Sequence, residues 1–267
     1  MSFVDIHAHL DSEGLYERLD EVVKSAEENG VEKIITSGAD LKSSLLAVEI
    51  ANKFPNVFAT IGIHPQDADG YDEKTEHILY QLCAVKCVQS MVSQEFRKVV
   101  GYGEFGLDYH YENCPSKEVQ KDVFIKQLVL ADKLKLPVVL HVRDAMEDAL
   151  AILKANKNLL KHGGVMHCFA GDVNALKEVL ELGFLISVGG VLTFKKNKLE
   201  EVVKEAGLDN IVLETDCPWL APEPFRGKLN EPKYIPLIAK KLAEVLNCSL
   251  KEVEEKTTAN VKRVFHI

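Results

Sequence analysis

Short apolar runs alternate with longer amphipathic segments along this 267-residue chain. The short runs are typical of buried strands, whereas apolar residues recurring every three or four positions favour helices. This pattern predicts eight strands, at residues 3–10, 33–38, 57–65, 99–104, 137–141, 164–167, 184–188 and 211–216. It predicts helices at 15–29, 41–54, 72–94, 116–134, 144–157, 232–246 and 250–263, with one more after Asp172; Asp144 and Asp172 are expected to cap the helices that follow them.

Strands that alternate with helices imply βαβ crossovers and an all-parallel sheet, so the fold class is α/β. Eight strands close a (β/α)8 TIM barrel, for which about 250 residues is a common length. No Pro-, Gly- or Ser-rich tract divides the chain, and we therefore expect a single domain over residues 1–267. A doubly wound open sheet is the alternative, but the glycine-rich dinucleotide turn is missing after the first strand.

Composition narrows the possible functions. Hydrophobic residues make up 46% of the chain, enough for a sizeable core, and the net charge is −9. Attraction to nucleic acid would therefore come from bound cations and a few local Arg and Lys residues, which weakens a passive nucleic-acid-binding role more than an enzymatic one. Six scattered cysteines without a CxxC pair, no signal peptide and no run of ~18–20 apolar residues predict a cytoplasmic protein with reduced thiols and no membrane contact. Cys83 and Cys87 are expected to share a packed helix face.

Histidines and acids stand at the ends of six predicted strands. His7 and His9 are two apart on one strand, so both project to the same side. A single histidine is more often a core residue, but the carboxyl ends of parallel barrel strands meet at one face, where several such residues form a metal site. The residues concerned are His7, His9, His64, Glu104, His141, His167 and Asp216.

The parity of neighbouring positions separates ligands from other residues. Cys168 and Cys217 directly follow predicted site residues, so their sulfurs should point away and behave as small buried hydrophobes. Arg143 lies two positions after His141 and can line the same face. Asp5 lies two positions before His7, and Glu214 lies two positions before Asp216, so each points the same way as that predicted ligand but lies deeper in the barrel. The two acids either fix imidazole tautomers or are ordinary buried carboxylates.

Several motifs occur together in one order. They are HAH at 7–9, GIHP at 62–65, GEFGLDY at 103–109, HVRD at 141–144, HCFAG at 167–171, LETDCPWL at 213–220, RGKLNEP at 226–232 and TTAN at 257–260. This set resembles the TatD-type metal-dependent deoxyribonucleases of the amidohydrolase superfamily, over essentially the whole chain. The long, cysteine-bearing 72–98 segment and Val142 depart from the family pattern, but neither is a proposed ligand.

The resemblance implies a TIM barrel that binds one or two divalent ions. It assigns ligand roles to His7, His9, Glu104, His141, His167 and Asp216, with Glu104 able to bridge two ions, and it places His64 near the substrate. Imidazole ligands suit Zn or Mn, and the carboxylates leave room for Mg.

The predicted function is hydrolysis of DNA phosphodiester bonds, of exonuclease type, on single-stranded or frayed ends. In this prediction Asp216 accepts the proton of the attacking water, and Glu104 and His64 complete the catalytic set. His64, Arg143, Arg226 or Lys228 could hold phosphate, although a solvated surface charge is an equal alternative for the arginines and the lysine. Trp219 or Tyr109 could stack on a base, with loop packing as an equal alternative. No stable protein partner is inferred.

Two other functions remain open at the level of sequence. One is hydrolysis of another ester or amide, such as D-aminoacyl-tRNA or an amidohydrolase substrate. Many such sites bridge their metals with a modified lysine at the end of the fourth strand, where this chain has Glu104. The other is a non-catalytic protein with a structural metal, but such sites are usually closed by Cys and His ligands, and the predicted set holds no cysteine.

Overall fold

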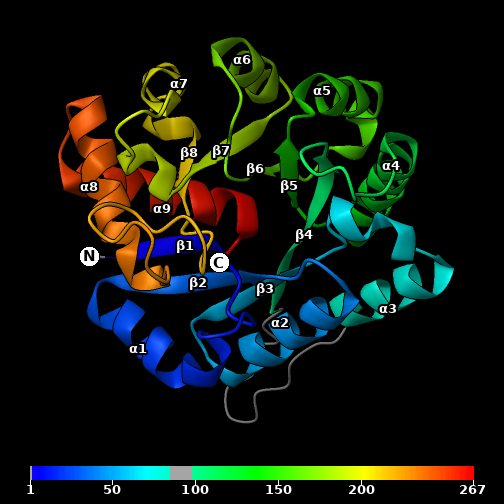
Figure 1. The fold of residues 1–267 in the computed structure, drawn as a ribbon, viewed down its shortest axis with the longest axis horizontal. Helices are drawn as coiled ribbons and strands as arrows, with labels where there is room; N and C mark the ends of the chain where they lie inside the picture. Colours follow the sequence, from blue (N-terminus) through cyan, green and yellow to red (C-terminus); the bar gives the residue numbers. More distant parts are fainter. Residues whose placement is uncertain (1, 85–97) are drawn as a thin grey trace. The chain divides into compact units, whose positions relative to one another are not determined.

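A computed structural model describes residues 2–84 and 98–267. Parallel strands alternate with helices in the order of the chain, and the sheet keeps that order from β1 to β8 (Figure 1). This arrangement confirms the predicted (β/α)8 fold class. The strands are β1 (Phe3–Ala8), β2 (Val31–Ser37), β3 (Val57–Ile61), β4 (Val99–Asp108), β5 (Val138–Arg143), β6 (Gly164–Met166), β7 (Phe184–Val188) and β8 (Ile211–Leu213).

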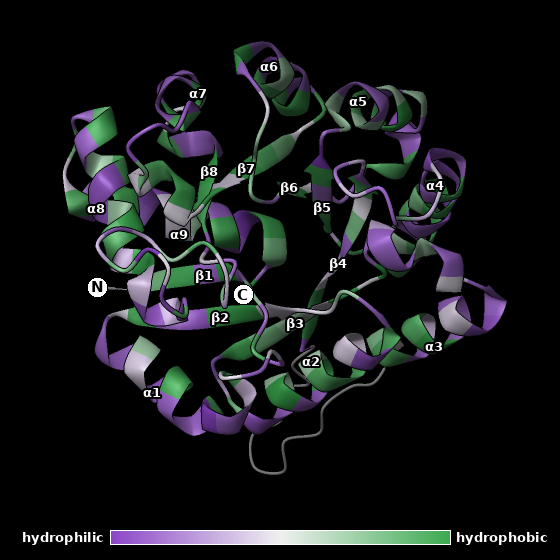
Figure 2. Ribbon diagram, viewed as in Figure 1, coloured by the Kyte–Doolittle hydropathy of each residue, from purple (hydrophilic) through white to green (hydrophobic). Residues whose placement is uncertain are grey.

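The helices are amphipathic, with hydrophilic and hydrophobic residues alternating around them, whereas the strands are mainly hydrophobic (Figure 2). No helix among residues 2–84 and 98–267 is long and apolar enough to span a membrane. The helices are α1 (Leu19–Glu28), α2 (Leu41–Lys53), α3 (Glu73–Ala84), α4 (Lys117–Leu134), α5 (Met146–Ala155), α6 (Val173–Glu181), α7 (Leu199–Ala206), α8 (Ile235–Leu246) and α9 (Leu250–Phe265).

Two compact units make up the chain. The first combines Met1–Ile35 with Gly164–Ile267. Within it, β6, β7 and β8 pair in parallel, and Ala8 of β1 forms a parallel bridge to Cys217 just after β8. Helix α6 packs against β7, while α8 and α9 pack against β8 (Figure 1). Because these strands are parallel, the residues that follow them gather at one edge of this unit.

The second unit comprises Thr36–Gly163. Here β3, β4 and β5 pair in parallel, and α4 packs against β4. Its core includes the buried rings of Tyr102, Phe105 and Phe124, which meet edge to face at centroid distances of 5.4 and 5.6 Å. The expectation of a single domain over residues 1–267 stays a prediction.

Some element boundaries differ from those expected. Strand β4 does not end at Glu104 but continues to Asp108, because the apolar residues of this stretch are buried and pair with β5. Strand β8 ends at Leu213, since the following Thr215 donates its backbone N–H to the Asp5 carboxylate instead of to a neighbouring strand. Helix α7 was not among the predicted segments. The expected continuation of α3 to residue 94, with Cys87, lies outside the described residues.

The two predicted N-caps had different outcomes. Asp172 accepts a hydrogen bond from the Ala175 N–H and caps α6, as predicted. The prediction for Asp144 was wrong: its φ is +52°, and its carboxylate lies 2.8 Å from Nδ1 of His110. Helix α5 starts at Met146 without a side-chain cap.

Candidate metal centre

Histidine nitrogens and a carboxylate converge where β1 and β8 end in the first unit. The Nε2 atoms of His7 and His9 lie 3.2 Å apart, and they lie 3.8 and 3.6 Å from the same oxygen, Oδ1 of Asp216. His7 and His9 are buried, and the Asp216 side chain is 15% exposed. The alternation of side chains along a strand therefore places both imidazoles on one side, as predicted.

His167 joins this cluster from the end of β6. Its ring stacks on that of His7 at 4.0 Å with an angle of 14° between the planes. His7, His167 and Asp216 each offer a ligand atom, and these atoms lie within 4.8 Å of one another. Nδ1 of His167 lies 3.8 Å from Oε2 of Glu214, the same oxygen that accepts a 2.5 Å hydrogen bond from the Ser187 hydroxyl. Glu214 therefore sits where it can orient the His167 ring.

The cluster fits a divalent cation. Two ligand atoms about 2.1 Å from one tetrahedral ion lie about 3.4 Å apart. The observed separations of 3.2 to 3.8 Å among His7, His9 and Asp216 are close to that value. Imidazole nitrogen combined with carboxylate oxygen suits Zn or Mn better than Ca. The donor set in this unit is therefore that of a metal site.

Burial and neighbouring charge set the protonation of two carboxyl groups at this cluster. Burial alone would raise the pKa of Asp216, but the hydrogen bond from His9 and the nearby His7 and His167 hold its pKa below the usual range. Burial raises the pKa of Glu214 to about 7, against the attraction of His167. A cation at the cluster would add to the stabilisation of the Asp216 carboxylate.

The Asp5 carboxylate accepts hydrogen bonds from backbone N–H groups and a hydroxyl, not from an imidazole. Its carboxylate accepts the backbone N–H of Thr215 at 2.9 Å and the Thr215 hydroxyl at 2.5 Å, and it lies 3.3 Å from the His7 backbone N. Burial raises the pKa of Asp5 to about 8 in spite of these donors. Asp5 thus ties the residue before Asp216 to β1, which favours a positional role over a tautomer-fixing one.

A second cluster lies in the other unit, where β3, β4 and β5 end. His64, Asp108 and His141 offer ligand atoms within 4.8 Å of one another. Nε2 of His141 lies 3.3 Å from Oδ2 of Asp108, and its Nδ1 lies 3.8 Å from Oε2 of Glu104. Three of the predicted site residues, His64, Glu104 and His141, therefore come together with one that the sequence did not single out.

Asp108 is that additional residue. It is buried at the end of β4, and its carboxylate also accepts the His110 N–H at 2.9 Å and lies 3.3 Å from the Gln66 amide. Burial would raise its pKa, but hydrogen bonds from His141 and His110 lower the pKa below the usual range. Asp108 lies four positions after Glu104 on the same strand, so the two side chains are expected on the same side. This spacing could have identified Asp108 as a site residue from the sequence.

The orientation of His64 suits contact with a substrate. Its Nδ1 accepts a hydrogen bond from the Gln66 N–H at 3.2 Å, so the neutral ring carries its proton on Nε2. The ring centroid lies 4.3 Å from that of His141. His64 can therefore donate a hydrogen bond to an anionic oxygen beside the second cluster.

Close packing of β4 on β5 brings Glu104 and His141 within reach of each other. Gly106 has a φ of +149°, and a Cβ at this position would stand 2.0 Å from the carbonyl oxygen of His141. Any side chain here would push the two strands apart. Glycine at 106 is therefore a requirement of this cluster and not of a turn.

Of the predicted phosphate-binding residues, Arg143 ends β5, whereas Arg226 and Lys228 lie in the loop after β8. Arg143 stacks on Tyr111 at 5.0 Å and donates to its hydroxyl at 3.1 Å, so it is held in place but half-exposed. Arg226 and Lys228 are exposed in the loop after β8. The structure of each unit taken alone leaves their role in phosphate binding a prediction.

The two aromatic candidates differ. Trp219 is 55% exposed, and its ring meets the His9 ring edge to face at 5.1 Å. The Tyr109 hydroxyl donates to Asp148 at 2.9 Å, and Lys117 lies over its ring at 4.4 Å. Trp219 is therefore open to a stacking partner beside a cluster residue, whereas Tyr109 serves loop packing.

The cysteines contribute no ligand to either cluster. Cys217 is buried, as predicted for a small hydrophobe, but Cys168, for which the same was predicted, is only half-buried. Cys83 is buried on α3, while its predicted partner on that helix face, Cys87, lies outside the described residues. The Cys168 backbone N–H donates to Glu214 at 2.7 Å, which turns the chain out of the strand direction directly after His167. The candidate metal groups among the described residues consist of His, Asp and Glu.

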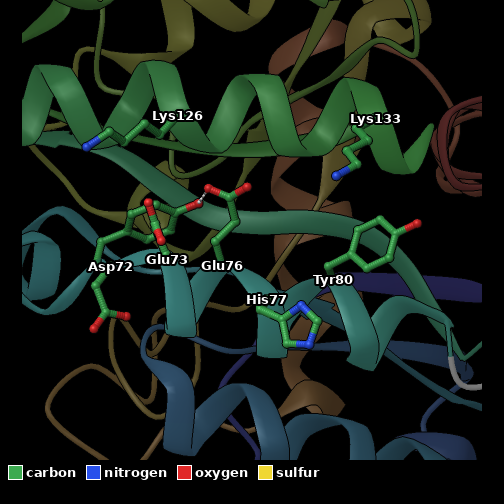
Figure 3. Close-up of a pocket in the computed structure, with 8 residues that line it drawn as sticks. Asp72, Glu73, Glu76, His77, Tyr80, Lys126 and Lys133 are labelled. Atoms are coloured by element: carbon green, nitrogen blue, oxygen red, sulfur yellow. Dashed lines mark hydrogen bonds between the residues drawn. The ribbon is translucent and has the colours of Figure 1, made fainter.

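A large cavity in the second unit lies apart from these clusters, between α3 and α4 (Figure 3). It measures about 690 Å³. Its two lysines have partners within the unit: Lys126 pairs with Asp122 at 2.7 Å, and Lys133 lies over the Tyr80 ring at 4.7 Å. None of the candidate metal groups of the described chain includes a residue that lines it, so we do not assign it a catalytic role. The lining residues are Tyr71, Asp72, Glu73, Glu76, His77, Tyr80, Lys126 and Lys133.

Comparison with known proteins shows the family to which this chain belongs. A family model described as TatD related DNase matches residues 4–266. The uncharacterized metal-dependent hydrolase YabD of Bacillus subtilis is 40% identical over 264 residues, which cover 98% of each chain. The uncharacterized metal-dependent hydrolase YcfH of Escherichia coli K12 is 34% identical and is matched over 100% of this chain and 97% of its own.

Solved structures agree with the sequence comparison. The crystal structure of YJJV, a TatD homolog from Escherichia coli, matches with a TM-score of 0.90 at 27% identity and covers 99% of this chain and 98% of that one. A TatD family hydrolase from Entamoeba histolytica matches with a TM-score of 0.85, also at 27% identity. Sequence, fold and the histidine–carboxylate clusters lead to one conclusion: the chain belongs to the TatD-related DNase family of metal-dependent hydrolases.

Proposed function

We propose that this protein hydrolyses phosphodiester bonds at single-stranded or frayed DNA ends, as an exonuclease, and that the two clusters belong to one centre for one or two divalent ions. The convergence of His7, His9 and Asp216 at ligand spacing is the observation that carries the proposal. In a TIM barrel the carboxyl ends of all strands face one side, which is the reason for expecting a single centre.

The ligand assignment keeps the six residues expected from the sequence and adds Asp108. The resemblance assigns Glu104 as the carboxylate able to bridge two ions, and its Oε2 lies 3.8 Å from Nδ1 of His141, so it would hold metal together with that histidine. Divalent ions in such a centre would neutralise phosphate charge and lower the pKa of coordinated water from 15.7 toward ~7 in favourable zinc sites.

The protein's own groups supply proton transfer and orientation. Asp216 accepts the proton of the attacking water, because its carboxylate lies at the metal cluster and a bound cation would keep it ionised. His64 donates its Nε2 hydrogen to a phosphate oxygen, given that its Nδ1 is an acceptor for Gln66. Arg143, held against Tyr111, and the loop cations Arg226 and Lys228 bind further phosphate oxygens.

The test combines metal analysis with parallel hydrolysis assays. The metal-loaded protein should release nucleotides from single-stranded DNA faster than from blunt duplex DNA, and EDTA or Asp216→Asn should abolish release. D-aminoacyl-tRNA and simple amide or lactone substrates are assayed beside it. Cleavage of one of these substrates with DNA left intact would replace the nuclease proposal by the other ester- or amide-hydrolase function.

A further inference from the structure

Two loops of the first unit contact each other beside the metal cluster. They are the segments 189–199, after β7, and 217–230, after β8. A Cβ on Gly190 would stand 1.9 Å from the carbonyl oxygen of Leu220, so the two backbones are in direct contact. The Glu223 N–H donates to the Thr193 hydroxyl at 2.9 Å. The loops therefore form one continuous edge.

This edge begins at the metal cluster. The Trp219 N–H donates to the backbone oxygen of Asp216 at 3.0 Å, and the Trp219 ring meets His9. The buried amide of Asn230 donates to the carbonyl oxygens of Thr215 and Trp219 at 2.8 and 2.5 Å. The exposed indole is thus held in a fixed position next to two candidate ligands.

Positive charge is concentrated along the same edge. The two segments carry five cations and a single carboxylate, Glu223, for a local charge of 5 − 1 = +4, in a chain whose net charge is −9. Arg226 lies over the Phe194 ring at 4.3 Å, which joins the lysine-bearing loop to the loop after β8. The five exposed cations are Lys195, Lys196, Lys198, Arg226 and Lys228.

These cations differ from other surface lysines of the same unit. Lys177 pairs with Glu205 at 3.2 Å, and Lys241 pairs with Glu200 at 2.7 Å. Within residues 2–84 and 98–267, none of the five cations of the edge lies within 4.0 Å of a carboxylate oxygen. Their charge is therefore available to an external anion.

We propose that this edge, the lysine edge (Lys195, Lys196, Lys198, Arg226 and Lys228), binds the phosphates of a single-stranded polynucleotide beyond the reacting phosphodiester. Trp219 stacks on a base between the lysine edge and the metal cluster. Single-stranded nucleic acid is bound by two components: exposed cations along its phosphate backbone, and aromatic side chains that stack on its bases. This inference rests on the proposed function and specifies which part of the protein holds the rest of the strand.

The test measures equilibrium binding, so it does not depend on turnover. The metal-loaded protein is titrated with a fluorescent single-stranded oligonucleotide whose phosphorothioate linkages resist hydrolysis, from about 50 to 200 mM salt. Each phosphate contact on a single strand contributes about −0.7 to the slope of log K against log salt. The variant K195Q/K196Q/K198Q should therefore reduce the slope by about 2. The matched control K177Q/K204Q/K240Q removes the same charge from α6, α7 and α8 and should leave the slope unchanged.

The tryptophan supplies an independent readout. Trp219 is the single tryptophan of the chain, so intrinsic fluorescence reports on this position alone. The oligonucleotide should quench it, whereas polyphosphate, which has charge but no bases, should not. An equal slope for both triple variants, or fluorescence unaffected by the oligonucleotide, would overturn the inference. Binding with the expected slope but without DNA hydrolysis would refute the proposed function alone.

Discussion

Two glutamines of α4 hold the strand ends that carry the second cluster, and removing one of them is a direct test of the geometry. The Gln127 side chain accepts the Ile63 N–H at 2.9 Å and donates to the Ile63 carbonyl at 2.8 Å. Gln120, two turns earlier on the helix, does the same for the N–H and carbonyl of Asp108, at 2.8 and 2.9 Å. Both glutamines are buried. They satisfy backbone groups of Ile63, just after β3, and of Asp108, the last residue of β4.

The replacement Gln127→Met keeps side-chain length and volume but removes both hydrogen-bonding groups. It leaves a buried N–H and a buried carbonyl of Ile63 without this partner, and it also removes the acceptor of the Tyr102 hydroxyl at 3.3 Å. Each unsatisfied buried polar group costs about 1–3 kcal/mol, so the two groups of Ile63 together should lower the free energy of unfolding by about 2–6 kcal/mol. Because Ile63 precedes His64, the substrate-contacting imidazole should also move.

The assay has two parts. Urea denaturation of the metal-free protein gives the change in unfolding free energy, and steady-state kinetics on single-stranded DNA gives kcat and KM. The control Gln81→Met alters an exposed glutamine of α3 whose amide contacts His77 at 2.8 Å, and it should change the unfolding free energy by less than about 0.5 kcal/mol. If Gln127→Met is as stable as this control, the Gln127–Ile63 hydrogen bonds do not hold the chain after β3, and the reasoning fails.

Other predictions concern the metal clusters. Asp216→Asn should abolish hydrolysis while circular dichroism and thermal unfolding stay close to those of the parent protein; an unfolded variant would instead indicate a structural metal. Asp108→Asn should weaken binding of a divalent ion by about tenfold or more, as measured by titration calorimetry, and unchanged affinity would exclude Asp108 from the centre. Metal retention should fall as pH drops through about 6.5, because histidine ligands bind only when neutral; retention that is flat between about pH 7.5 and 5.5 would contradict imidazole ligation.

The sequence predicted those features that depend on local pattern. Strand periodicity located β7 without error, and the two-residue spacing of His7 and His9 predicted correctly that both imidazoles face one side. Each of these inferences needs only the period of two along an extended chain. The ends of strands were less predictable, because a charged residue such as Glu104 normally indicates that a run of buried residues, and with it the strand, has ended. In β4 the burial of Glu104 against His141 lets the strand continue to Asp108.

The features that the sequence could not reveal are those in which a distant side chain completes the backbone. Gln127 and Ile63 are 64 positions apart, and Asp5 and Thr215 are 210 apart, yet each pair fixes the residue next to a candidate site residue, His64 or Asp216. A buried glutamine on an amphipathic helix has no periodic signal that separates it from a solvated one. Such contacts also explain why the cluster geometry should be sensitive to changes outside it. The ligands lie on or next to strand ends, so their positions depend in part on the side chains that satisfy the backbone there.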